Sequence, residues 1–360
     1  MAYGQTGSGK THTMFGPPGI MTRAANADYG LEPTADYGLY PRGVLDIVNR
    51  VRELNDSGTT FNYVLVASAV EIGIFGKVDM LVQAESGGGE VDWNELETKH
   101  DQCGVQLDRV AEPKYLYGQT EVNLHDEDRN IYRTFAAIAT RNTMGTGMNN
   151  SSSRTCCFAA FLTLYCHDSN TDCVRKSRFQ FVDLAGSERL KDAHNGNTNY
   201  RTNMHDANFM AGYCNNWCLM QLSRCVRELV QYRRQGSRGH FSFNSYLVDL
   251  VFMLSESLVG SAHTAIFVCL SQAPRNNMQS SVALDFGEVF SKLSIRPSAN
   301  KWKKKAKLKL QAAATLTGAK AALGNAERSS GGAARNKHVP KRRAQIVMSR
   351  QLLDVLKQFG

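Results

Sequence analysis

Several features that would place this 360-residue chain in a special class are absent from its sequence. It has no run of about 18 consecutive apolar residues, which argues against a membrane-spanning helix. Its first residues, MAYGQTGSGK, lack the charged start and the apolar stretch of a secretory signal peptide. It has nine cysteines but no C-x-x-C pair, which argues against a zinc site, and the odd number argues against a complete disulfide framework. We therefore expect reduced thiols in a cytosolic protein.

Positive charge is distributed unevenly along the chain. Apolar residues make up 42% and charged residues 21%, as in an ordinary globular protein. The formal net charge is +9, but residues 294–360 alone hold 16 lysines and arginines against two acids, a net charge of +14. The body before them is slightly acidic. The sequence therefore indicates a main domain over residues 1–293 and a basic, partly disordered tail over 294–360.

Hydrophobic periodicity predicts strands that alternate with helices. Apolar runs typical of strands occupy residues 61–72, 156–166, 178–184 and 264–271. Helical spacing occurs over 43–55, 126–140, 206–233, 243–256 and 275–293. Within the tail, residues 344–359 have the spacing of one short helix. This alternation predicts an α/β fold, with a parallel or mixed central sheet and helices on both faces.

A glycine-rich loop near the start of the chain matches the phosphate-binding pattern G-x-x-x-x-G-K-[ST] in full. It consists of Gly4, Gln5, Thr6, Gly7, Ser8, Gly9, Lys10 and Thr11. Glycines allow backbone N–H groups to curl around phosphate oxygens, the lysine reaches the β- and γ-phosphates, and the threonine hydroxyl binds Mg²⁺. Taken alone, the pattern is also compatible with a flexible turn, so the loop needs support from elsewhere in the sequence.

Two further segments provide that support. Asp183 ends the apolar strand RFQFV, the position at which proteins with such a loop place a carboxylate linked to Mg²⁺. Gly186, three residues later, can offer its N–H to a γ-phosphate without a side-chain clash. The third segment, Asn149–Arg154, reads NNSSSR and is by itself no more than a polar loop.

Together the three segments resemble one family, the kinesin motors. AYGQTGSGKTHTM resembles the family's phosphate-binding loop, TGMNNSSSR its switch I and DLAGSER its switch II, and the resemblance runs over residues 1 to about 293. It implies a P-loop NTPase that binds ATP and Mg²⁺ and hydrolyses ATP to move along microtubules, in the cytoplasm and on the cytoskeleton. Membranes are not expected as partners, nor is nucleic acid, although the basic tail leaves nucleic acid open.

The resemblance also implies roles for individual residues. Thr11, Ser153 and, through a water molecule, Asp183 are expected to hold Mg²⁺. Gly186 is expected to sense the γ-phosphate. Arg154 and Glu188 are expected to form the ion pair that closes the two switches around the attacking water. Positioning of this kind is what phosphoryl transfer requires, more than a strong base.

The chain departs from the family at three places. Kinesin motors have strands before the phosphate-binding loop, whereas this chain begins three residues before Gly4. We therefore expect missing N-terminal strands, a loop with no strand before it, and incomplete burial of the neighbouring strands. Trp217 replaces the lysine of a helix that faces the microtubule, and Cys156 replaces the histidine that follows switch I.

These departures leave two functions open. The intact motifs favour an ATP-driven, microtubule-associated motor. The missing strands and lost cations favour a non-motile remnant with weak or no ATPase, which binds microtubules or another polyanion through its basic tail.

Overall fold

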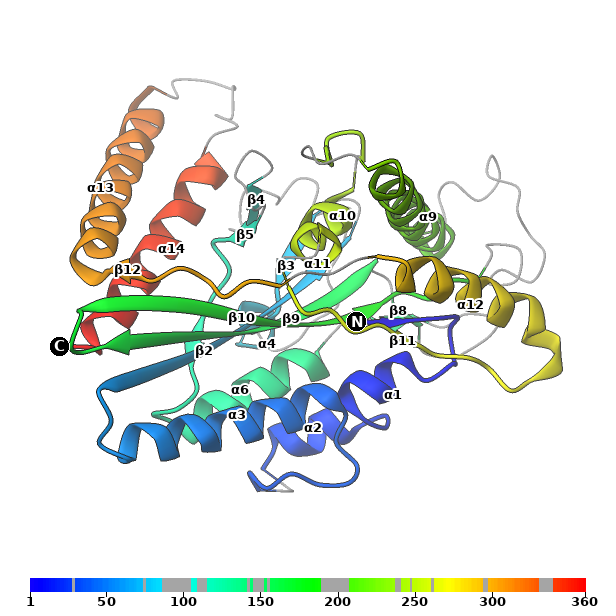
Figure 1. Ribbon diagram of the computed structural model, residues 1–360, viewed down its shortest axis with the longest axis horizontal. Coiled ribbons are helices and arrows are strands. Elements are labelled where there is room, and N and C mark those ends of the chain that lie inside the picture. Colours follow the sequence, from blue (N-terminus) through cyan, green and yellow to red (C-terminus); the bar gives the residue numbers. More distant parts are fainter. Residues whose placement is uncertain are drawn as a thin grey trace.

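The computed structural model describes residues 1–27, 30–73, 76–85, 105–108, 115–140, 143–144, 152–153, 156–188, 207–236, 241–246, 248–259, 262–293, 297–329 and 339–360. Its centre is a mixed sheet with helices on both faces, as the sequence predicted (Figure 1). No helix among these residues is both long enough and apolar enough to cross a membrane.

Three long strands dominate the sheet. They are β2 (Phe61–Ile72), β9 (Cys157–Asp168) and β10 (Cys173–Leu184), which pair antiparallel in the order β10-β9-β2. The short strands β3 (Lys77–Asp79) and β6 (Val122–Asn123) pair with β2. Two small hairpins stand apart from this sheet: β4 (Gln106–Asp108) with β5 (Tyr115–Tyr117), and β7 (Thr143–Met144) with β8 (Ser152–Ser153).

The loop predicted to lack a preceding strand has one. Residues Ala2–Tyr3 form β1, which lies between β10 and β11 (Phe267–Val268) and is parallel to both. The Met1 and Tyr3 carbonyls accept hydrogen bonds from the N–H groups of Phe267 and Cys269, each at 2.8 Å. Two residues suffice because each parallel neighbour supplies hydrogen bonds along one edge. The short partner also explains why β11 covers only two residues of the predicted strand 264–271.

The expected incomplete burial is found in only one of the three strands. β2 is buried from Val64 to Ile72, and β9 is buried along most of its length, because helices pack on both of their faces. In the predicted strand 178–184, now part of β10, only Val182, Asp183 and Leu184 are buried, and Phe179 is 43% exposed. The expectation is therefore wrong for β2 and β9 and is confirmed for β10.

Successive side chains of a strand point to opposite faces, so residue parity assigns each helix to a face. Leu65, Ala67 and Ala69 of β2 share one core cluster with four helices: α1 (Lys10–Phe15), α2 (Ile20–Ala25), α3 (Leu39–Asp56) and α6 (Asp128–Ala139). Val70 of β2 belongs to the opposite cluster, with α9 (Ala207–Arg234), α10 (Asp249–Met253), α11 (Ser255–Val259) and α12 (Asn277–Ser291). Figure 1 shows these two helical layers below and above the sheet.

The structure refines several predicted elements. The helix expected over 243–256 is two short helices, α10 and α11, and the helix over 275–293 is a 3-10 turn (Pro274–Asn276) followed by α12. The short helix α4 (Met80–Glu85) follows β3, where the Asp79 carboxylate accepts hydrogen bonds from the N–H groups of Leu81 and Val82. Burial raises the pKa of Asp79, and these hydrogen bonds act in the opposite direction.

Where the sequence indicated a partly disordered tail with one short helix, the structure has two long helices. After strand β12 (Lys303–Lys304), which pairs with β10, come α13 (Lys305–Ser329) and α14 (Val339–Lys357). The predicted helix over 344–359 largely coincides with α14. Helix α13 was missed because its apolar side is mostly alanine, for example Ala312 and Ala319, which gives little hydrophobic periodicity. We call α13 and α14 the C-terminal hairpin.

The C-terminal hairpin is fixed to the sheet by a small apolar cluster, and this makes its stability testable. Leu356 is fully buried there, whereas Leu310 of α13 is 73% exposed. We expect Leu356→Ala to lower the free energy of opening of α14 by about 2–5 kcal/mol, because a cavity is left behind. Leu310→Ala should change it by less than about 0.5 kcal/mol. Amide hydrogen exchange of α14 measures both, and equal protection in the two variants would contradict this packing.

Candidate functional site

The glycine-rich loop connects β1 to α1 and needs its glycines for two different reasons. Gly4 has φ +149°, and a Cβ atom there would lie 2.2 Å from the Cys269 carbonyl oxygen, so no larger residue fits. Gly7 and Gly9 have φ +77° and +96°, a region that L-residues with side chains rarely occupy. The sequence pattern thus encodes a backbone that turns sharply over the end of the sheet.

The loop is held closed by contacts to one carbonyl. The Gln5 carbonyl oxygen accepts hydrogen bonds from Lys10 Nζ and Ser8 Oγ, both at 2.8 Å. The Lys10 side chain is almost fully buried. Its ammonium therefore lies inside the curve of the loop, where it would face a bound phosphate chain.

Tyr3 anchors the loop on its N-terminal side. Its ring stacks on Phe286 of α12, with centroids 4.0 Å apart, and burial raises the pKa of its hydroxyl. The strand before the loop is thus attached to the helical layer that contains α9 and α12.

Thr11 and Asp183, both predicted to serve a magnesium ion, lie next to each other. The Thr11 hydroxyl donates a hydrogen bond of 2.6 Å to Asp183 Oδ2. This contact follows from the sheet, because Ala2 of β1 is in register with Asp183 of β10. A hydroxyl and a carboxylate are the hard oxygen donors that Mg²⁺ prefers, so this pair fits such an ion.

The segment after β10 packs directly on the loop. The Ser187 N–H donates to the Gly4 carbonyl at 3.0 Å. Glu188 is buried, and its carboxylate accepts hydrogen bonds from both the Thr6 N–H, at 2.8 Å, and the Thr6 hydroxyl, at 2.5 Å. A Cβ atom at Gly186 would lie 2.1 Å from Glu188 Oε2 and 2.3 Å from Thr6 Oγ1. Only glycine therefore allows the segment and the loop to approach this closely.

The structure does not address the third predicted segment. Ser153 lies in β8, paired with Thr143 of β7, but its side chain and all of Arg154 lie outside the described residues. Their proposed roles remain predictions. The residues that the structure does bring together come from two of the three motifs, the loop with Thr11 and the Asp183–Glu188 segment.

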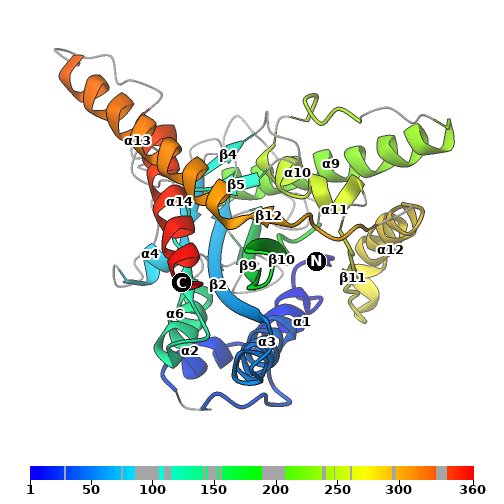
Figure 2. The ribbon, with the colours of Figure 1, turned by 60° about the vertical axis from the view of Figure 1, so that its left-hand side comes forward.

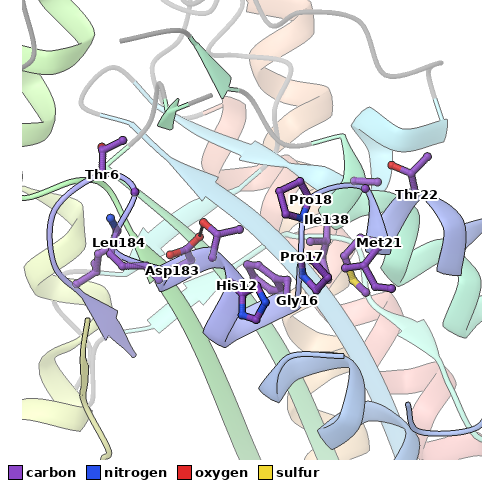
Figure 3. Close-up of a pocket in the computed structure, with 18 of the residues that line it drawn as sticks. Thr6, His12, Gly16, Pro17, Pro18, Met21, Thr22, Ile138, Asp183 and Leu184 are labelled. Carbon is purple, nitrogen blue, oxygen red and sulfur yellow. Dashed lines mark hydrogen bonds between the residues drawn. The ribbon is translucent and has the colours of Figure 1, made fainter. Parts of the chain in front are cut away.

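These two motifs line one end of a cavity of about 460 Å³. Figure 3 shows Thr6 and Asp183 toward one end of it, and Pro17, Pro18, Met21 and Ile138 toward the other. The second wall is formed by the end of α1, the turn before α2, and the end of α6. Sequence reasoning missed this wall because its residues belong to no motif, and apolar side chains near helix ends are usually core residues.

The close approach at Gly186 gives a test of this geometry. We expect Gly186→Ala to displace the Glu188 carboxylate from Thr6, because the new methyl group has no space between them. If the chain hydrolyses nucleotide as the resemblance implies, the rate should fall by about 100-fold, which is the scale for loss of one positioned donor, while the thermal unfolding temperature should change little. Gly318→Ala, on α13 with no atom within 4 Å of the new Cβ, is the control. Unchanged hydrolysis in Gly186→Ala would refute the contact.

Comparison with known proteins matches this arrangement. The family model for the kinesin motor domain matches residues 1–293. The kinesin-like protein unc-104 of Caenorhabditis elegans is 30% identical over 281 residues, which cover 76% of this chain and 15% of that protein. The human chromosome-associated kinesin KIF4B is 26% identical, over 83% of this chain and 21% of its own length. The chain therefore spans only about a fifth of the length of such relatives.

A solved structure shares the fold. A KIF14 dimer with AMP-PNP, in a two-heads-bound state and in complex with a microtubule, superimposes with a TM-score of 0.63 at 22% sequence identity. The match covers 83% of this chain and 72% of that one. Since the family model covers far more than half of the sequence and the sheet and its loop have the same architecture, the chain belongs to the kinesin motor domain family.

Proposed function

We propose that this chain is a Mg²⁺- and ATP-dependent motor domain that hydrolyses ATP in association with microtubules. The observation that carries the proposal is the pair of contacts joining the loop to the Asp183–Glu188 segment, Thr11 to Asp183 and Thr6 to Glu188, beside a cavity. Family membership supports the partner, because kinesins as a family act on microtubules.

In this proposal the loop binds the phosphates. Its backbone N–H groups and the Lys10 ammonium neutralise the β- and γ-phosphates, and the Thr11 and Asp183 oxygens hold Mg²⁺. When bound, the ion neutralises charge that develops on the phosphate oxygens. The cavity volume lies within the range typical of small-molecule sites.

In this proposal, the segment after β10 changes position with the state of the nucleotide and so acts as a switch. Gly186 lies beside Thr6, and we propose that its N–H donates a hydrogen bond to the terminal phosphate. Glu188, with Arg154 from switch I, would orient the attacking water. Because Ser187 donates to Gly4, a shift of this segment changes the loop as well, which gives one physical route from nucleotide state to conformation.

In this proposal, the side that faces the microtubule has more positive charge than was expected from the replacement of a family lysine by Trp217. Trp217, which replaces a family lysine, is partly buried and packs against the core. Arg224, Arg227 and Arg234 instead form an exposed stripe along the C-terminal half of α9. Arg224 is paired with Glu228 at 2.7 Å, whereas Arg227 and Arg234 have no carboxylate partner in the part of the chain that the structure describes. This stripe supports docking on an acidic surface.

The nucleotide site is tested by removing its cation. We expect Lys10→Ala to weaken Mg²⁺-ATP binding by about 100-fold, since a charged hydrogen bond to phosphate contributes roughly 1.5–3 kcal/mol. Isothermal titration calorimetry measures the affinity, and Lys320→Ala on α13 is the matched control. Equal affinity in both variants would reject the site, and would leave the alternative of a remnant that uses only its basic residues.

The switch pair is tested by a double-mutant cycle. Arg154→Ala and Glu188→Ala should each slow microtubule-stimulated ATP hydrolysis by about 100-fold. The double variant should be little worse than either, because two groups that position one water act as a unit. Steady-state turnover with and without microtubules measures this, and fully additive losses would show that the two residues work independently.

A further inference from the structure

The C-terminal hairpin docks on the same face of the sheet as α9. Val64 and Val66 of β2, which contact α14, have the same parity as Val70, which belongs to the cluster around α9. Side chains two and four residues apart on a strand share a face. Figure 1 shows α13 and α14 above the sheet with α9, and Figure 2 shows α13 projecting from the body.

The hairpin is attached at several points, so it is positioned as part of the domain. Val355, Leu356 and Phe359 are buried against the sheet. β12 adds hydrogen bonds to the edge of β10, and the Lys305 ammonium lies 2.9 Å from Asp172 Oδ1 at the turn between β9 and β10. The His167 ring stacks on Phe359 and lies 2.9 Å from the same carboxylate oxygen. These contacts fix the direction in which the hairpin surface points.

The exposed charges of the hairpin are mostly positive. Ala312, Ala319 and Ala344 are buried, whereas Leu310 and several alanines of α13 are exposed between the cations. Five exposed cations have no carboxylate partner among the described residues: Lys307, Lys320, Lys341, Arg343 and Arg350. Of the two acids in residues 294–360, Asp354 is ion-paired with Lys357 at 2.8 Å. Such a surface fits a polyanionic partner.

We propose that the C-terminal hairpin is a second docking element for the acidic microtubule surface, acting beside the arginine stripe of α9. The inference rests on the proposed microtubule partner and adds the surface that meets it. Placement decides between polyanions: the hairpin shares its face with α9 and contacts the β4–β5 hairpin, so one large acidic surface can engage all of them. A nucleic acid would not need this common orientation.

Charge reversal on the hairpin tests the proposal in the full chain. Lys320→Glu with Arg350→Glu removes one unpaired cation from each helix. Arg50→Glu with Arg129→Glu makes the same change in net charge on α3 and α6, which cover the opposite face. Co-sedimentation with microtubules in the presence of a non-hydrolysable ATP analogue, at low and at about 0.3 M salt, gives the affinities.

We expect the hairpin variant to bind microtubules about tenfold more weakly at low salt, with the difference shrinking at high salt because exposed charges are screened. The opposite-face variant should stay within about twofold of the unmodified chain. Unfolding temperatures and ATP affinity should be the same in all three, and Lys320→Gln with Arg350→Gln should give an intermediate loss. If the charge-reversed variant does not fold, the glutamine variant tests the proposal in its place.

Each of the other possible results of this experiment would contradict a different part of the proposal. Undiminished microtubule binding by both hairpin variants would refute the hairpin's role and leave the proposed motor function intact. An equal loss in the hairpin and opposite-face variants would show that only net charge matters. An unmodified chain that binds duplex nucleic acid but not microtubules would reject both the proposed partner and the hairpin's role.

Discussion

The insertion of Ala2–Tyr3 between β10 and β11 is the interaction on which the rest of the site depends. It is only two residues long, yet it sets the register that places Ala2 beside Asp183 and therefore Thr11 within a hydrogen bond of that carboxylate. It also joins the two halves of the chain, since β10 and β11 lie more than 80 residues apart in sequence. Without this pairing the glycine-rich loop would have no fixed starting direction.

The sheet also divides the molecule into two sides with different tasks. On one side, α1, α2, α3 and α6 support the loop and the cavity. On the other, α9, α12 and the C-terminal hairpin cover the sheet, and α9 and the hairpin expose cations to solvent. Tyr3 links the sides, because its strand leads into the loop while its ring stacks on α12. The cavity and the exposed cations thus lie on opposite layers that are linked through β1.

The long strands and the proximity of the loop to Asp183 were predictable from the sequence. Residues 61–72 are a largely apolar run, and β2 has those bounds because such a run suits a central strand that is buried on both faces. The residue types of the loop motif and of Asp183 both indicate a site for Mg²⁺ and phosphate, so their proximity could be expected from the sequence. A two-residue strand such as β1 carries no periodicity, so its pairing depends on partners distant in the sequence.

Other features could not be predicted from the sequence, and particular residues show the physical reasons. In α13, Ala312 and Ala319 bury little area each, and helix formation there relies on packing against α14, which no local pattern reveals. The apolar wall of the cavity, with Pro17 and Ile138, is formed by residues that elsewhere would simply fill a core. The position of Glu188 against Thr6 depends on the absence of a side chain at Gly186, which the motif gave no reason to expect.

The hydrogen bonds between Glu188 and Thr6 affect how the loop would respond to a nucleotide. A carboxylate already satisfies donors that a phosphate would otherwise be the first to meet, so the loop keeps its shape between one ligand and the next. Under the proposed function, an arriving nucleotide would exchange one anion for another, and its affinity would report only the difference between the two. The same carboxylate would take the place of a released phosphate, so the protein's own anion would define the resting state of the site.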